Sequence, residues 1–119
     1  MEKQKFEDLI VWQKSYYLLK EIYRELKVCR DFGFKYQITR SSLSVPSNIA
    51  EGYERGSNRE FIRFLQIAKG SCGELRTQLY AAVDIGYLNK EKGDQLVKES
   101  LEISYMLNAL IAKRKTFQS

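Results

Sequence analysis

The sequence predicts an all-α fold, an antiparallel up-down-up-down four-helix bundle, on three observations. Apolar residues recur at intervals of three and four in four successive segments, and no segment has the two-residue period of a strand. The connections between these segments are short, which favours antiparallel neighbours. A length of 119 residues with 44% hydrophobic content suits one domain, residues 1–119, that buries its own core.

The first helix is predicted over residues 9–27, with Asp8 as its N-cap. Trp12 is interpreted as a core residue, although an aromatic side chain can also stack on a base. After Cys29 the run RDFGFKYQ contains Gly33 and loses the helical period, so it is predicted to be a connection. The apolar stripe of this helix comprises Leu9, Trp12, Tyr16, Leu19, Ile22 and Leu26.

The second helix is predicted to contain Pro46 in its interior. Proline removes the hydrogen bond to the carbonyl of Ser42 and crowds the preceding turn. Neighbouring serine hydroxyls can satisfy the backbone groups that this break leaves open. The sequence therefore predicts a continuous helix kinked at Pro46, with two short helices meeting there as the alternative. Its apolar and small-residue stripe comprises Tyr36, Ile38, Thr39, Ser42, Val45, Ile49, Ala50 and Tyr53.

A sharp corner is predicted next, because Gly56 can end a helix with positive φ and Ser57 with Glu60 forms a capping box. The third helix then runs to Gly86, and Asn89 caps the fourth. The third helix is predicted to bury Phe61, Phe64, Leu65, Ala68, Cys72, Leu75, Leu79, Ala82 and Val83. The fourth is predicted to bury Leu96, Val97, Leu101, Ile103, Leu107, Leu110 and Ile111.

The chain contains no histidine, which removes most acid/base catalysis at neutral pH and the usual zinc and di-iron ligand sets. Glu51 and Glu54 share a helix face but lack the histidines of a di-iron bundle, so they are interpreted as solvated carboxylates. Cys72 lies on a buried stripe with no histidine to activate it. We therefore predict a non-enzymatic protein with no catalytic residue, no metal and no cofactor.

The net charge of +5, from 20 Lys and Arg against 15 Asp and Glu, favours anionic partners, although charge also serves solubility alone. On the third helix, Arg59 and Arg63 are predicted to point away from the core, with Lys69 and Arg76 displaced to one flank. An ordinary solvated helix face is the alternative. The nucleic-acid-binding candidates are Arg59, Arg63, Lys69, Arg76, Arg40, Arg55 and Lys14.

Gly70 and Gly73 fall on the outer side of the same helix, where glycine costs about 1 kcal/mol relative to alanine. Close approach of another backbone explains such glycines, so both are candidates for a subunit interface. Glu51 and Glu54 are further candidates, because carboxylates of one subunit can pair with Arg59 and Arg63 of another. The same arginines therefore have two open interpretations.

The two cysteines have no metal-ligand spacing, and no segment approaches the roughly 20 apolar residues of a membrane span. The N-terminus MEKQKFEDLIVWQK lacks the pattern of a signal peptide. These features predict a cytoplasmic protein with reduced thiols and no membrane partner.

Two stretches carry a family resemblance: FEDLIVWQKSYYL and QITRSSLSVPSNIAEGYERGSNREFIRFLQIAKGSCGELRTQL. The runs SVPSNIAEG (44–52) and REFIRFL (59–65) are the most specific parts. The chain closely resembles the four-helix bundle proteins of the 23S ribosomal RNA intervening-sequence family. That resemblance implies a homopentameric ring, and it extends to the accessory variability proteins of diversity-generating retroelements, basic barrels that bind nucleic acid and a reverse transcriptase.

The family supplies no catalytic site and no cofactor. The expected function is therefore a homo-oligomer that binds RNA or DNA backbone, as an adaptor for a nucleic-acid enzyme such as a reverse transcriptase. A structural assembly or protein-interaction module without nucleic acid is the alternative.

Overall fold

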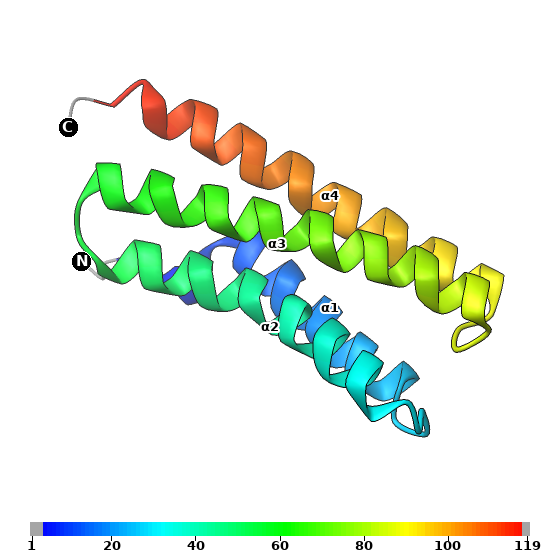
Figure 1. Ribbon diagram of the computed structural model, residues 1–119. Coiled ribbons are helices and arrows are strands. Elements are labelled where there is room, and N and C mark those ends of the chain that lie inside the picture. Colours follow the sequence, from blue (N-terminus) through cyan, green and yellow to red (C-terminus); the bar gives the residue numbers. More distant parts are fainter. Residues whose placement is uncertain (1–3, 118–119) are drawn as a thin grey trace.

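The computed structural model describes residues 4–117, which form a bundle of long helices (Figure 1). A short 3-10 turn, η1 (Phe6–Asp8), precedes α1 (Ile10–Glu25), α2 (Phe32–Glu54), α3 (Asn58–Ile85) and α4 (Lys90–Lys115). Each helix packs antiparallel against the next, and α4 returns to contact α1 (Figure 1). The described residues contain no strand, so the all-α prediction and the order of the helices are confirmed. The bundle measures 47 × 23 × 23 Å.

All four helices contribute to one core. The third and fourth helices bury most of the predicted stripes, whereas Val83, Val97, Leu101 and Leu110 lie at the core margin. Within residues 4–117, no helix combines the length and apolar character needed to cross a membrane. The largest fully buried side chains are Leu18, Ile22, Leu26, Ile38, Ile49, Leu65, Leu75, Leu79, Leu96, Ile103, Leu107 and Val45.

The start of α1 differs from the prediction. Its N-cap is Leu9, which gives no side-chain cap, and Asp8 belongs to η1. The Asp8 carboxylate instead accepts a hydrogen bond from the Lys5 backbone N–H at 3.0 Å. Because the Asp8 side chain is hydrogen-bonded within η1, it does not cap α1, and the prediction that Asp8 caps the first helix is wrong.

The second helix begins earlier than predicted, at Phe32, so most of the expected connection is helical. Asp31 caps it by accepting a hydrogen bond from the Phe34 backbone N–H at 3.2 Å. A glycine in a first turn is tolerated when the cap satisfies the open backbone groups, which is why Gly33 does not stop the helix. Sequence patterning gave weight to Gly33 and overlooked the cap.

Two tyrosines assigned to apolar stripes are exposed: Tyr16 is 43% exposed and Tyr36 is 59% exposed. The predicted Leu19, Ile22 and Leu26 are buried, and Val11 and Leu18 are core positions that the predicted stripe missed. Trp12 is partly buried against this core and stacks on Tyr16, with ring centroids 4.9 Å apart. The tyrosines therefore lie outside the core, where their hydroxyls remain in water.

α2 is continuous through Pro46, which excludes two short helices meeting there. Side chains around the proline bond to local carbonyls: the Ser42 hydroxyl donates to Thr39 O at 2.9 Å, and the Asn48 amide donates to Ser44 O at 2.8 Å. Neither bond reaches the Ser42 carbonyl that Pro46 leaves open, so the predicted role of the serine hydroxyls in satisfying that group stays a prediction. The kink itself stays a prediction.

The α2–α3 corner follows the predicted chemistry in part: Ser57 caps α3, but among the described contacts Glu60 does not complete the predicted capping box, because its carboxylate pairs with Arg63. Gly56 has φ of 83°, and the Ser57 hydroxyl accepts from the Glu60 backbone N–H at 3.1 Å. At the other end of α3, Gly86 has φ of 97°. The Asn89 side chain then caps α4 by accepting from the Lys92 backbone N–H at 2.7 Å.

Candidate nucleic-acid interface

The α2–α3 corner gathers three of the predicted cations, Arg55, Arg59 and Arg63. Arg59 and Arg63 are exposed and line an open hollow of about 550 Å³ with Glu60, Ile62 and Gln66. The prediction that these two arginines point away from the core therefore agrees with the structure. Their electrostatic surroundings, however, include carboxylates of the same chain.

Arg55 and Arg63 are held by ion pairs. Arg55 Nη2 lies 2.8 Å from Glu51 Oε2, and Arg63 Nε lies 2.8 Å from Glu60 Oε2. Both guanidinium groups also lie over the ring of Phe64, at 5.0 and 4.5 Å from its centroid. The hydrogen bond from Arg63 lowers the pKa of the Glu60 carboxyl below its ordinary value. The positive charge of this corner is thus partly neutralised from within.

Lys69 and Arg76 lie farther along α3. Lys69 is exposed, but Arg76 is only partly accessible, and its Nη1 is buried without a hydrogen-bond partner. Arg76 acts electrostatically on the neighbouring Cys72, yet burial dominates and raises the pKa of that thiol to about 11. Arg76 therefore lies closer to the core than the helical projection suggested, and Cys72 is kept as a neutral thiol.

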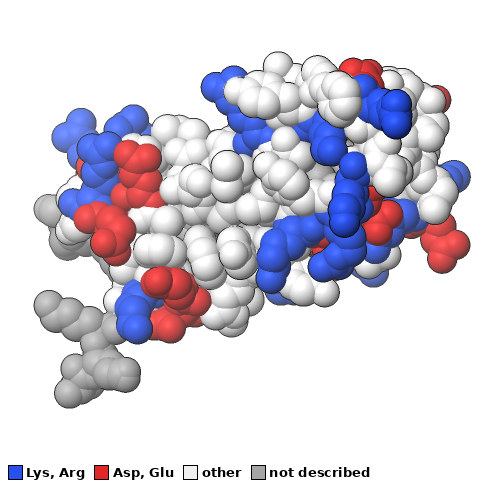
Figure 2. Space-filling model, turned by 90° about the horizontal axis from the view of Figure 1, so that it is seen from below, with Lys and Arg blue, Asp and Glu red and all other residues white. Residues whose placement is uncertain are grey.

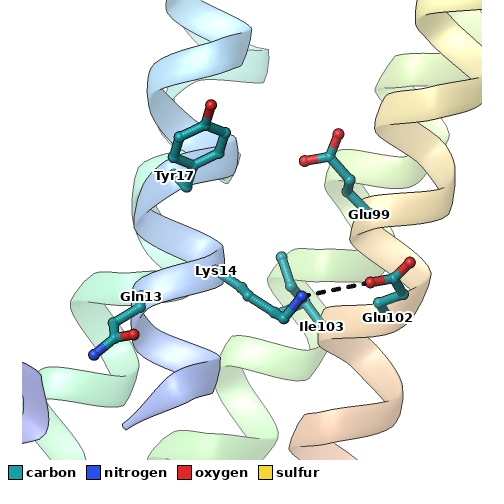
Figure 3. Close-up of a pocket in the computed structure, with 6 residues that line it drawn as sticks. All are labelled: Gln13, Lys14, Tyr17, Glu99, Glu102 and Ile103. Carbon is teal, nitrogen blue, oxygen red and sulfur yellow. Dashed lines mark ion pairs between the residues drawn. The ribbon is translucent and has the colours of Figure 1, made fainter. Parts of the chain in front are cut away.

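Lys14 lies in a separate place, the groove between α1 and α4 (Figure 3). Its Nζ is 3.7 Å from Glu102 Oε2, beside a cavity of about 220 Å³. Gln13, Tyr17, Glu99 and Ile103 complete the lining of this cavity. Lys14 thus does not extend the α3 patch.

A buried acidic contact lies in the same α1–α4 seam. Glu21 is 7% exposed, with Oε2 3.6 Å from Lys92 Nζ and Oε1 unpartnered. Burial, together with the neighbouring Glu21, raises the pKa of Glu99 to about 7. Gln95 donates a hydrogen bond to Glu99 Oε2 at 3.3 Å. A carboxyl that is protonated near neutral pH can donate the hydrogen bond that two carboxylates cannot make.

Arg40 is exposed on α2 between the sides that face α1 and α3, and it borders a hollow of about 260 Å³ with Gln37, Ser41, Ser44 and Glu74. Ser41 donates to Glu74 Oε1 at 3.1 Å, which keeps this carboxylate on the α2 side of α3. The seven predicted cations therefore do not form one continuous patch. They divide between the α2–α3 corner, the flank of α3 and two grooves.

Besides the predicted Arg40, five cations that the sequence reading did not single out lie in α1, the start of α2 and the turn between them. Residues 20–40 contain six Lys and Arg against three Asp and Glu, and these cations form no ion pair within the described residues. Two of the three acids are occupied, because Glu21 is buried near Lys92 and Asp31 accepts from the Tyr87 hydroxyl at 2.6 Å. The six are Lys20, Arg24, Lys27, Arg30, Lys35 and Arg40.

Figure 2 shows this asymmetry from the α1–α2 side. Near the grey terminal residues, Lys and Arg are interleaved with Asp and Glu, whereas blue predominates toward the opposite end. The signal was readable in the sequence, because Lys20, Arg24 and Lys27 follow the four- and three-residue spacing of one helix face. This segment therefore has more cations without an ion-pair partner among the described residues than the predicted α3 patch.

The interface candidates on α3 are open within the chain. A Cβ at Gly70 or Gly73 would meet no atom within 4 Å. Glu51 is already paired with Arg55, and Glu54 is exposed. Among residues 4–117, no cluster of three or more His, Cys, Asp or Glu is arranged to hold a metal ion.

Comparison with known proteins places these features in a family context. Residues 7–109 match the family model described as 23S rRNA-intervening sequence protein. A crystal structure of a protein with unknown function from the S23 ribosomal protein family, from Bacteroides thetaiotaomicron, superimposes with a TM-score of 0.80 and 28% sequence identity. The match covers 86% of this chain and 98% of that one. No curated protein matches the chain.

Proposed function

Because the chain belongs to the family of 23S rRNA-intervening sequence proteins, we propose that it is a non-enzymatic homo-oligomer that binds RNA or DNA backbone through basic surfaces. One observation carries this proposal: the cations of residues 20–40 are free of ion pairs within the described chain and lie toward one end of the bundle. Free cations at a surface attract phosphates without first giving up an internal partner. The two free cysteines fit a reducing cytoplasm as its place of action.

Backbone binding of this kind releases counterions from the nucleic acid, so affinity falls steeply with salt. Repetition of the basic end in an oligomer would multiply the number of phosphates contacted. Arg59 and Arg63 at the α2–α3 corner are a second contact in this proposal, weaker because Glu60 already neutralises part of their charge. We expect binding to depend little on the nucleotide sequence, because contacts with phosphates do not distinguish one base from another.

The test is titration of labelled RNA and DNA of equal length at low and moderate salt. We expect binding at low salt that weakens as salt rises. A variant with Lys20, Arg24 and Lys27 changed to Gln should lose most of this affinity, whereas Arg59→Gln with Arg63→Gln should lose less. Absence of binding at low salt, with the oligomer intact, would contradict the proposal.

Assembly rests on a different observation, the two outward glycines of α3. Gly70 and Gly73 have open space where a Cβ would stand, so nothing within the chain requires glycine there. Close approach of a second copy would require it. The ring of five subunits implied by the family resemblance is our proposed assembly, with Glu51 and Glu54 available to pair with arginines of a neighbour.

Light scattering on a sizing column measures the number of subunits directly. A monomer at micromolar concentration would contradict the assembly. Gly70→Ala and Gly73→Ala should weaken the oligomer while leaving the helical content unchanged. If these variants assemble normally, the interface lies elsewhere.

A second candidate function is a structural assembly or protein-interaction module without nucleic acid, which the same glycines favour. A nucleic-acid enzyme such as a reverse transcriptase is a further proposed partner, on the strength of the family resemblance alone. Binding of a purified partner that persists after nuclease treatment, in a protein that fails the titration above, would select this second function.

A further inference from the structure

Tyrosines and lysines alternate along the outer face of α1. Tyr16, Lys20, Tyr23 and Lys27 follow one another at intervals of four, three and four residues, so they share one side of the helix and the turn after it. Tyr16 and Tyr23 are 43% and 49% exposed, and both lysines are exposed. Tyr16 stacks on Trp12 at the core margin, whereas Tyr23 has no ring or hydrogen-bond partner among the described residues, so packing within the chain does not require an exposed ring at Tyr23.

α2 presents a matching row. Tyr36, Arg40 and Leu43 are spaced by four and three residues, and all three are exposed. Leu43 lines an apolar hollow together with Trp12 and Tyr16, which fixes the register of the two helices. Because α1 and α2 are antiparallel, moving seven residues toward their turn brings Tyr36 level with Tyr23.

At the turn itself, Lys35 Nζ donates a hydrogen bond to Lys27 O at 3.2 Å, which joins the two rows. Tyr16, Lys20, Tyr23 and Lys27 of α1, with Tyr36 and Arg40 of α2, are called the Tyr–Lys stripe below. From Tyr16 to Lys27 the stripe is about 16 Å long at 1.5 Å per residue.

The chemistry of the stripe fits flat, anionic partners. Lys20 Nζ lies 5.0 Å from the ring centroid of Tyr16 and 5.7 Å from that of Tyr17, and it has no carboxylate partner among the described residues. Aromatic faces next to cations are the arrangement that binds single-stranded nucleic acid, with bases stacked on the rings and phosphates near the charges.

A second copy of the chain that docks through this same face fits it less well. Covering Lys20, Lys27 and Arg40 with another protein surface removes their hydration and requires carboxylate partners. The exposed carboxylates of α2, Glu51 and Glu54, lie near its far end, beyond the hollow that Tyr16 lines, and Glu74 of α3, beside Arg40, already accepts from Ser41. A nucleic-acid strand brings its own negative charges, and those glutamates limit it to the half of the face near the turn.

We propose that the Tyr–Lys stripe binds single-stranded RNA or DNA, with bases stacked on Tyr23 and Tyr36 and phosphates contacted by Lys20, Lys27 and Arg40. This inference rests on the proposed nucleic-acid function and adds the form of the ligand. Bases within a duplex are already stacked and cannot lie on these rings. At about 3.4 Å per nucleotide, the stripe has room for roughly five nucleotides.

The experiment measures the affinity of the full-length oligomer for a labelled uridine 12-mer, a thymidine 12-mer and a duplex of the same length. We expect both single strands to bind more tightly than the duplex. Tyr23→Ala with Tyr36→Ala should weaken single-strand binding at least roughly tenfold and leave duplex binding unchanged. Both positions are exposed in helices, where alanine is well tolerated.

Matched controls separate stacking from general effects. Tyr80→Ala with Tyr105→Ala changes two tyrosines that are 55% and 65% exposed on α3 and α4, and it should leave binding unchanged. Lys20→Gln with Lys27→Gln should reduce the slope of log affinity against log salt by about 1.4, whereas Lys98→Gln with Lys115→Gln should not.

Three outcomes overturn the inference. The first is equal affinity for single strands and duplex, and the second is an equal effect of the stripe and control tyrosine pairs. The third is a change in oligomer size in the Tyr23→Ala, Tyr36→Ala variant with affinity unchanged, which would make this face an interface between copies. In all three, nucleic-acid binding itself persists. If instead the unmodified protein binds none of the three probes, the proposed function itself is contradicted.

Discussion

Two helix–helix contacts of the bundle, the α2–α3 seam and the α1–α4 seam, differ in the kind of side chains that form them. Between α2 and α3, small neutral residues bring the helices together: Gly52 packs against Phe64, and the hydroxyls of Ser44 and Ser71 are 2.8 Å apart. Between α1 and α4 lie a cavity of about 220 Å³ and several ionisable groups, among them Lys14, Glu99 and Glu102. Close packing therefore stabilises one seam, and charge and protonation govern the other.

The comparison teaches where the molecule is sensitive to solution conditions. Contacts between small neutral residues do not change with pH or salt, so the α2–α3 seam should vary less with either, although Ser41 donates to the Glu74 carboxylate and Arg55 pairs with Glu60 there. The α1–α4 seam contains a carboxyl that titrates near neutrality and an exposed ion pair, so its stability should depend on pH. The following predictions test this contrast.

The largest effect is expected from Gly52→Ala. A Cβ at this position would lie 2.5 Å from Phe64 Cβ, too close for the two helices to keep their spacing. We expect a loss of about 2 kcal/mol or more in the free energy of unfolding, measured by urea denaturation. Gly33→Ala is the matched control, because its Cβ would make only an ordinary contact of 3.9 Å with Asp31 Oδ1 and alanine is favoured over glycine in a helix. Equal effects of the two substitutions would remove the contrast between the seams.

The next effect is a pH dependence centred on Glu99. Its folded pKa, about 7, lies above the ordinary value of 4.5, so the folded state binds more protons between these pH values. The wild-type melting temperature should therefore fall as pH rises from about 5 to 7.5. Glu99→Gln keeps a neutral hydrogen-bonding group and should flatten this fall, melting a few degrees above the wild type at pH 8. Parallel curves for the two proteins would show that this carboxyl does not control the seam.

A smaller effect is expected from the serine contact of the α2–α3 seam. Ser44→Ala or Ser71→Ala should cost about 1 kcal/mol, the typical net value of one hydrogen bond. The double variant should lose less than the sum of the single losses, because the two hydroxyls bond to each other. Calorimetry at pH 5 and pH 8 should give the same cost, in contrast to Glu99. A cost that changes with pH would contradict the neutral character of this seam.

The smallest effect is expected from Lys14→Gln. Lys14 and Glu102 are about half exposed at 49% and 47%, and such pairs contribute less than about 0.5 kcal/mol. The change should be undetectable at moderate salt in thermal unfolding. A loss of more than 1 kcal/mol would indicate that the α1–α4 seam depends on this pair.

Much of the fold was predictable because its signals are local. Gly56, Gly86, Ser57 and Asn89 act within one turn of their own positions, and each occupies the predicted cap or corner. Asp31 is equally local, but Gly33 obscured it. The periodic pattern treated tyrosines as apolar residues, although their hydroxyls favour positions at the edge of the core.

The candidate surfaces were less predictable because ion pairs depend on which helices become neighbours. Helical projection was enough to place Arg59 and Arg63 outward. The Lys14–Glu102 ion pair could not be predicted in this way, because it joins residues far apart in the chain that become neighbours only in the folded bundle. The Arg63–Glu60 pair is close in sequence, yet its formation depends on side-chain conformation. The free cations of residues 20–40 were readable from spacing alone, and their lack of partners was not.

The two ends of the described chain, residues 4 and 117, lie at the same end of the bundle (Figure 1). The Tyr53 hydroxyl donates to Gln4 O at 2.9 Å, and Arg114 spans the rings of Phe61 and Phe117 at 4.7 and 5.2 Å. Tyr53 and Phe61 are themselves in edge contact, with centroids 5.6 Å apart. A fluorophore or a fused domain attached at either end would therefore mark the same pole, along an axis of 47 Å that leads to the α1–α2 turn. The efficiency of energy transfer from a label at this end to a labelled ligand would therefore measure the orientation of the bound ligand along the bundle.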